Sequence, residues 1–178
     1  MASLSDRVIK KDIKATAKLL RLIERHDPIA REELKALYPY TGNACIIVLT
    51  GLPGSGKSTI INALLDDFRQ DEKEIGVIAA DPLSPFSGGS LLGDRIRMQS
   101  HFSDEQVFIK SFSTSGWHEG ISEVTSRMIT VMGAMGKDIV LVETVGVGQA
   151  EVNIKKLVHT TVVVLVGCFG DFIQVLKA

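Results

Sequence analysis

The residues best suited to chemistry form a glycine-rich run at positions 51–58, which reads Gly-Leu-Pro-Gly-Ser-Gly-Lys-Ser. Glycines let the backbone turn tightly enough for successive N–H groups to point at phosphate oxygens. In this pattern Lys57 is expected to reach the β and γ phosphates, and the Ser58 hydroxyl is expected to bind Mg²⁺. A purely structural glycine-rich turn is the competing interpretation. The position of this run between a predicted strand and a predicted helix favours a nucleoside triphosphate site over a structural turn.

Three carboxylates stand at places where such a site would use them. Asp81 and Glu143 end predicted strands, and Asp94 follows a second glycine-rich loop at residues 87–93. An isolated aspartate at a strand end is usually a turn residue. Because Mg²⁺ prefers oxygen ligands and keeps several waters, carboxylates near the phosphates bind it directly or through water. We therefore predict a metal site made by Ser58, Asp81, Asp94 and Glu143.

The segment after Glu143 has the character of a nucleotide-sensing loop, Thr-Val-Gly-Val-Gly-Gln at residues 144–149. A strand-end acid followed by glycine lets a loop sense the γ-phosphate. Gly146 is expected to offer its backbone N–H there. Gln149 has two interpretations of equal weight, orienting the attacking water or capping the next helix.

The elements that position these residues alternate between strand and helix. Continuous apolar runs predict buried strands, and helical spacing predicts the helices that connect them. The strands are expected at residues 44–50, 75–80, 107–112, 138–143 and 160–166, and the helices at 58–69 and 121–135. This order predicts an α/β fold of the P-loop NTPase class, a mostly parallel sheet with helices on both faces. Ligands bind at the carboxyl ends of such strands.

A helical segment is predicted before the sheet. Residues 5–38 carry apolar side chains at helical spacing, among them Ile13 and Ile29, and Asp27-Pro28 predicts a helix restart. We divide the chain into a helical segment, 1–42, and a P-loop domain, 43–178. Lysines surround the first apolar stripe, and they form either a partner surface or a solvated helix face. They are Lys10, Lys11, Lys14 and Lys18.

The composition of the chain limits the classes of partner and the cellular location that it can have. The formal net charge of −1 argues against nucleic acid or an anionic membrane as the main partner. No apolar run approaches the roughly 20 residues that span a bilayer, and the first residues lack a secretory or transit pattern. Cys45 and Cys168 lie in or beside β-rich runs and are expected to be buried, reduced thiols. These features together favour the cytoplasm.

The motifs together resemble a known family, the MeaB/ArgK-type GTPases that act as chaperones of methylmalonyl-CoA mutase. The resemblance is carried by the phosphate loop and by three further segments. They are Asp81-Pro82 with Ser-Gly-Gly-Ser-Leu-Leu-Gly-Asp-Arg at 87–95, Glu-Thr-Val-Gly-Val-Gly-Gln at 143–149, and Gly170-Asp171. It covers nearly the whole chain.

The resemblance implies slow GTP hydrolysis coupled to a cobalamin-dependent acyl-CoA mutase, with Mg²⁺ and GTP or GDP bound. It implies that Lys177 lies near the nucleotide when the mutase is engaged. The residues implied for catalysis are Lys57, Asp94, Glu143, Gln149 and Lys177. Those implied for nucleotide binding are Gly51, Pro53, Gly54, Ser55, Gly56, Lys57, Ser58, Thr59 and Gly146.

The sequence departs from the family pattern at its end. Family members continue past the position of Ala178 with an Asn/Thr-Lys-x-Asp motif that reads guanine and with a region that forms a homodimer. Both are expected to be absent here, so the preference for GTP over ATP rests on the resemblance. Two alternatives therefore stay open, a truncated nucleotide-binding module without turnover and a P-loop kinase acting with ATP.

Overall fold

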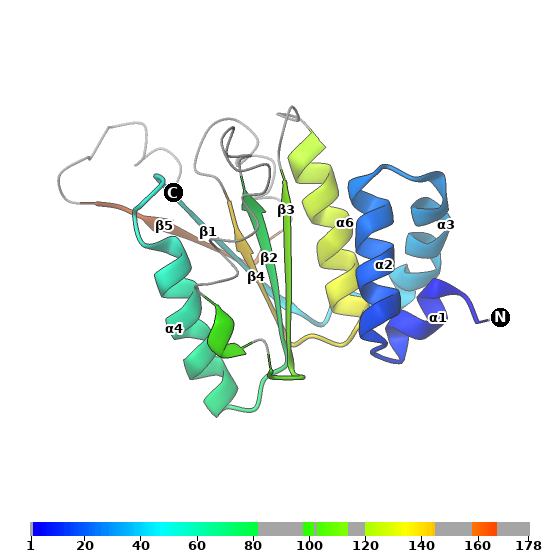
Figure 1. The fold of residues 1–178 in the computed structure, drawn as a ribbon, viewed down its shortest axis with the longest axis horizontal. Helices are drawn as coiled ribbons and strands as arrows, with labels where there is room; N and C mark the ends of the chain where they lie inside the picture. Colours follow the sequence, from blue (N-terminus) through cyan, green and yellow to red (C-terminus); the bar gives the residue numbers. More distant parts are fainter. Residues whose placement is uncertain (1, 82–97, 102, 114–119, 145–157, 167–178) are drawn as a thin grey trace.

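A five-stranded parallel sheet lies at the centre of the fold (Figure 1). The structure is a computed structural model, and it describes residues 2–81, 98–101, 103–113, 120–144 and 158–166. The strand order is β3-β2-β4-β1-β5. The strands are β1 Cys45–Gly51, β2 Ile75–Asp81, β3 Val107–Ser113, β4 Ile139–Glu143 and β5 Thr160–Val164. The five predicted strands and the parallel α/β arrangement are confirmed.

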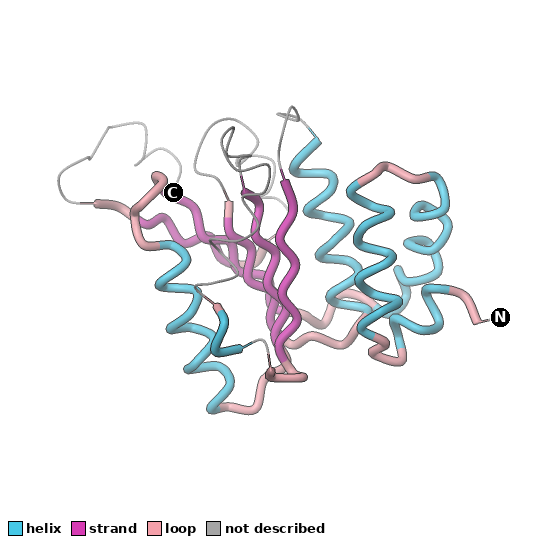
Figure 2. Tube along the Cα trace, viewed as in Figure 1, coloured by secondary structure: helices cyan, strands magenta, loops and turns pink. Residues whose placement is uncertain are grey.

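Helices cover both faces of this sheet (Figure 2). On one face lie α4, Lys57–Gln70, and the short helix η2, Gln99–His101. On the other lies α6, Gly120–Ala134, with an outer layer packed on it. The outer layer consists of α1 Leu4–Ile9, α2 Ile13–Glu24, α3 Pro28–Leu37 and the short helix η1 Tyr38–Tyr40. None of the described helices is both long and apolar enough to cross a membrane.

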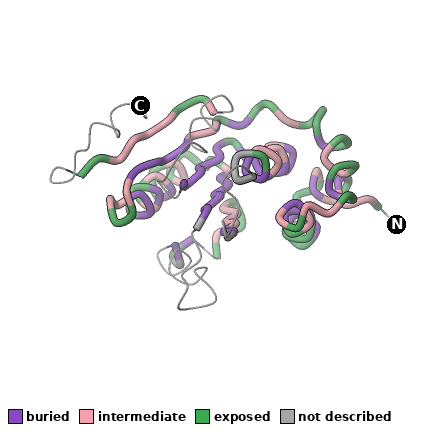
Figure 3. Tube along the Cα trace, turned by 90° about the horizontal axis from the view of Figure 1, so that it is seen from above, coloured by how far each residue is buried: buried purple, intermediate pink, exposed green. Residues whose placement is uncertain are grey.

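The alternation of side chains along each strand produces two hydrophobic cores. In β4, Val140 and Val142 point into the core beneath α6, whereas Ile139 and Leu141 point into the core beneath α4. All five residues of β4 are buried, which explains why its sequence is a continuous apolar run. Figure 3 shows the central strands largely buried and exposed residues gathered on the outer helices.

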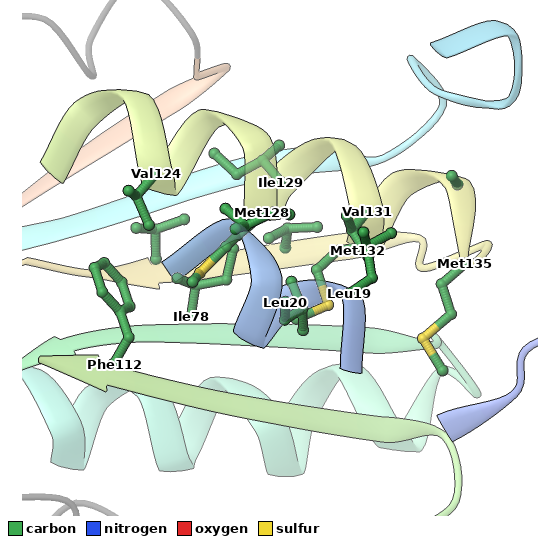
Figure 4. Close-up of a cluster of buried hydrophobic side chains, with 14 of the residues drawn as sticks. Leu19, Leu20, Ile78, Phe112, Val124, Met128, Ile129, Val131, Met132 and Met135 are labelled. Atoms are coloured by element: carbon green, nitrogen blue, oxygen red, sulfur yellow. The ribbon is translucent and has the colours of Figure 1, made fainter. Parts of the chain in front are cut away.

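The core beneath α6 is filled by methionines. Met128, Met132 and Met135 are buried, and they lie between the sheet and α2 (Figure 4). Gly76 of β2 permits this approach, because a Cβ there would lie 3.1 Å from the Met132 sulfur. The buried methionines of α6 therefore pack against the sheet.

Side-chain caps start the outer helices. Ser3, Asp12 and Asp27 each accept a hydrogen bond from a backbone N–H in the first turn of the helix that follows. The restart predicted at Asp27-Pro28 is confirmed. The break between α1 and α2 was not predicted, since Lys11 there adopts a φ of 61° without being glycine or asparagine.

The expected burial of Cys45 is wrong, and two apolar residues of the outer helices are exposed. Cys45 is exposed because β5 pairs with β1 only from Ile47 onward, which leaves the start of β1 uncovered on that side. Ile13 and Ile29 are 54% and 57% exposed, because both lie in the first turn of their helices, beyond the packed part. Cys168 lies outside the described residues.

Candidate nucleotide site

The glycine-rich run forms the turn between β1 and α4, at the carboxyl end of the sheet. Gly51 is the last residue of β1, and the Ser55 N–H donates to the Leu52 carbonyl at 3.1 Å, which closes the turn. A Cβ on Gly51 would lie 2.4 Å from the Val164 carbonyl oxygen of β5. Only glycine therefore allows the loop and β5 to come together.

The start of α4 differs from the starts of the outer helices. Its N-cap is Gly56 at φ 95°, with no side-chain cap and no acidic residue in the first turn. The positive end of the helix thus faces the turn without an acidic residue of its own first turn to offset it. Within the turn, Ser55 Oγ is buried and has no hydrogen-bond partner among the described residues. A polar atom left in this position suits a loop built to receive phosphate oxygens.

Lys57 folds back over the turn. Its Nζ donates to the carbonyl oxygens of Gly51 and Leu52, each at 3.1 Å, and the residue is buried. The ammonium group is thereby held against the loop. This is the position from which it can neutralise a phosphate that the loop binds.

Ser58 of α4 and Glu143 of β4, far apart in the sequence, meet at the carboxyl edge of the sheet. The Ser58 hydroxyl donates to Glu143 Oε1 at 2.9 Å across a separation of 85 residues, and both residues are buried. A hydroxyl and a carboxylate are the hard oxygen ligands that Mg²⁺ takes. The described residues contain no group of three or more His, Cys, Asp or Glu that could hold a metal ion. Magnesium at nucleotide sites needs only one or two carboxylates with the phosphates, so this pair fits.

Thr144 holds Glu143 in position, a role that its place in the sequence did not predict. Its backbone N–H and its hydroxyl both donate to the Leu49 carbonyl, at 3.1 and 3.3 Å. Glu143 is the register partner of Leu49, so this contact fixes the end of β4 beside the turn. A hydroxyl residue directly after a strand-end acid is the signal that would have indicated it.

The structure brings part of the predicted site together. The turn and the start of α4 hold Gly51, Pro53, Gly54, Ser55, Gly56, Lys57, Ser58 and Thr59, with Glu143 beside them. Thr59 is exposed on the first turn of α4. Asp81 ends β2 at the same edge of the sheet, since Ala79 is the register partner of Glu143. The Asp81 side chain lies outside the described residues, and so do Asp94, Gly146, Gln149 and Lys177.

Comparison with known proteins agrees with this geometry. The family model described as methylmalonyl Co-A mutase-associated GTPase MeaB matches residues 16–178. A putative GTPase of Pyrococcus abyssi is 49% identical over 98% of this chain and 54% of its own length. GTPase ArgK of Escherichia coli is 36% identical over 97% of this chain and 54% of its own length. The chain thus spans about half the length of these curated relatives.

The fold also matches a solved structure. The crystal structure of an LAO/AO transport system kinase superposes with a TM-score of 0.70 at 27% identity, covering 90% of this chain and 48% of that one.

Proposed function

This chain belongs to the MeaB family of methylmalonyl-CoA mutase-associated GTPases, and we propose that it binds GTP with Mg²⁺ and hydrolyses it slowly. The observation that carries this proposal is the hydrogen bond between Ser58 and Glu143 beside the buried Lys57. A turn that only connected a strand to a helix would have no need for a carboxylate, a hydroxyl and an ammonium group buried together.

The residues of the turn contribute by position and charge. The backbone of residues 51–56 and the start of α4 receive the phosphates, and Lys57 neutralises their charge. Ser58 and Glu143 would supply oxygen ligands for Mg²⁺, and Asp81 and Asp94 would complete its shell. When bound, the metal neutralises charge that develops on the phosphate oxygens. As the family resemblance implies, Gly146 would donate its N–H to the γ-phosphate, Gln149 would orient the attacking water, and Lys177 would approach the nucleotide when a partner is engaged.

The family name associates its members with methylmalonyl-CoA mutase. We propose a partner of this kind for this chain. In this proposal the chain acts in the cytoplasm as a chaperone of a cobalamin-dependent acyl-CoA mutase. Support comes from the family match over residues 16–178 and from the sequence resemblance at 87–95 and 143–149. A slow intrinsic rate suits this role, because a partner that completes the site then controls turnover.

Titration with fluorescent GDP, GTP and ATP analogues, with and without Mg²⁺, tests the nucleotide assignment. Guanine-selective, Mg²⁺-dependent binding that is lost in Lys57→Ala would support it. The variant must show an unchanged circular dichroism spectrum, so that the loss reports on the site. Weak and equal binding of GTP and ATP would instead identify a phosphate-binding module without base recognition. Absence of binding to the folded parent chain would overturn the proposal for this chain.

A further inference from the structure

The outward side of α2 carries a line of basic side chains. At 100° per residue, positions spaced by four, three and four fall within an arc of about 60° and extend for about 16 Å along the helix. These four residues, the α2 basic stripe, are Lys14, Lys18, Arg21 and Arg25. All four are exposed, and the buried residues of the helix, Leu19, Leu20 and Ile23 among them, lie on the opposite side.

The acidic residues near the stripe are engaged elsewhere. Asp12 caps α2 and forms an ion pair with Arg7 at 2.7 Å. Glu24 forms an ion pair with Lys110 of β3 at 2.6 Å, and Asp27 caps α3. Within the described part of the chain, no ion pair involves any of the four stripe residues. Among the residues that the structure describes, the four positive charges of the stripe thus have no ion-pair partner, on a chain of net charge −1.

The stability of α2 does not account for this arrangement. Like charges three or four positions apart destabilise a helix by about 0.2–0.5 kcal/mol for each pair. Arg21 and Arg25 lie near the carboxyl end, where positive charge is favourable, but Lys14 lies in the first turn, where it is unfavourable. A helix selected only for stability would alternate acidic and basic residues along this side.

We propose that the α2 basic stripe docks an acidic face of a protein partner, and the identification of that partner as the acyl-CoA mutase rests on the proposed function. A membrane surface is disfavoured because the apolar side of α2 is buried in the core and cannot insert into lipid. Nucleic acid is disfavoured because α2 has no aromatic side chain for base stacking and the chain has no overall positive charge.

The position of the stripe suits a chaperone. The α2 helix lies on the α6 side of the sheet, whereas α4 covers the other side (Figure 1). A partner held at α2 therefore leaves the start of α4 and the phosphate turn accessible to nucleotide. Charge pairs of this kind contribute mostly to the rate and specificity of association.

The double variant Lys14→Glu/Arg21→Glu tests the proposal without weakening the helix. It converts each repulsive neighbour pair of the stripe into an attractive one and places a carboxylate at the start of α2. We expect a melting temperature close to that of the parent, because the new attractive pairs offset the lost favourable charge of Arg21 near the carboxyl end of α2, and we expect unchanged nucleotide affinity. By contrast, affinity for the purified mutase falls at least tenfold at low salt. A merely structural role for these residues would not separate stability from binding in this way.

A matched control makes the same change in net charge elsewhere. Lys35→Glu/Lys73→Glu alters exposed residues of α3 and of the turn after α4, and the ion pair of Lys35 with Glu32 is too exposed to matter for stability. Mutase affinity is expected to change by less than twofold. Equal affinity of the mutase for the parent and for the stripe variant would overturn the docking inference and leave the proposed function intact.

If the parent chain does not bind the mutase, the proposed partner is overturned. A synthetic peptide then tests the docking inference by itself. The peptide is a helix with glutamates at positions i, i+4, i+7 and i+11, compared with a scrambled peptide of the same composition. Preference for the ordered peptide that the stripe variant loses supports an acidic protein face. Equal binding of both peptides, or stronger binding to single-stranded DNA or phosphatidylserine vesicles, contradicts it.

Discussion

At the scale of single residues, Glu143 is the proposed magnesium ligand whose position depends most on tertiary contacts. Its carboxylate is buried, accepts the Ser58 hydroxyl and is fixed by the contact of Thr144 with Leu49. A buried carboxylate is costly unless hydrogen bonds or a cation compensate its charge. The arrangement therefore indicates that the negative charge, and not only the shape, of this residue serves the site.

The variant Glu143→Gln tests the contribution of the charge. Glutamine keeps the size of the side chain and an oxygen that accepts the Ser58 hydroxyl, but it removes the charge that attracts a divalent cation. We expect Mg²⁺-dependent GTP binding to weaken at least tenfold, about 1.4 kcal/mol. Binding measured in EDTA is expected to change little. A fluorescent GTP titration at several Mg²⁺ concentrations measures both.

The matched control is Glu123→Gln on α6. Glu123 is exposed and forms an ion pair with Arg127 at 2.5 Å, so its replacement makes the same chemical change far from the turn. It is expected to leave nucleotide binding unchanged. If Glu143→Gln behaved like this control, the magnesium role of Glu143 would be wrong.

The close approach of Gly51 to β5 supports a second prediction. Alanine at this position would place a Cβ 2.4 Å from the Val164 carbonyl and 3.0 Å from Ser55 Oγ, at a φ of 151°. We expect Gly51→Ala to lower the free energy of unfolding by about 3 kcal/mol, from overpacking added to backbone strain. Urea denaturation measures this loss.

Gly54→Ala provides the comparison for Gly51→Ala. The φ of Gly54 is 77°, but a Cβ there would meet no atom within 4 Å. The expected loss is about 1 kcal/mol, from strain alone. Equal losses in the two variants would show that the contact with β5 does not constrain the turn.

At the scale of elements, local pattern was sufficient for the strands and for most helices. Buried parallel strands are continuous apolar runs, and this signal lies in neighbouring residues. The break at Lys11 was missed because a positive φ in lysine has no sequence signature, and the exposure of Cys45 was missed because it depends on the register of β5. The sequence predicted Ser58 and Glu143 as magnesium ligands. Their contact, however, depends on which strands are neighbours in the sheet.

Lys137 joins the connections at the amino ends of the strands. Its Nζ donates to the Gln106 carbonyl at 2.8 Å and lies 3.4 Å from Glu74 Oε2, which also pairs with Lys11. Burial lowers the pKa of Lys137 below its ordinary value, and the nearby Glu74 carboxylate only partly opposes that effect. The lysine therefore links the segments before β2, β3 and β4.

The lowered pKa of Lys137 predicts how stability depends on pH. Between the lowered pKa and the ordinary lysine value, about 10.4, the unfolded chain binds a proton that the folded chain does not. Stability due to this group therefore rises with pH through that alkaline window. The rise is expected to be absent in Lys137→Met. Urea denaturation of both proteins through the alkaline range up to the ordinary lysine pKa measures the difference, and parallel pH profiles would contradict it.

At the scale of the whole molecule, the outer helices and the sheet share a core. Val8, Leu19 and Leu20 are fully buried in the same cluster as Ile78 and Val140 of the sheet. The sequence suggested a helical segment, 1–42, and a P-loop domain, 43–178. A shared core predicts that the two parts unfold together, because neither can expose its half of the cluster without cost to the other.

Leu20→Ala tests this cooperativity. The side chain is fully buried between α2 and α6, so its loss is expected to cost about 3 kcal/mol. In hydrogen exchange followed by mass spectrometry, peptides of α2 and β4 should lose protection by the same amount, since both exchange through global unfolding. Ile13→Ala, in the exposed first turn of α2, should cost under about 0.5 kcal/mol. Loss of protection in α2 alone would show instead that the outer helices form a separate unit, and the phosphate site would then be independent of them.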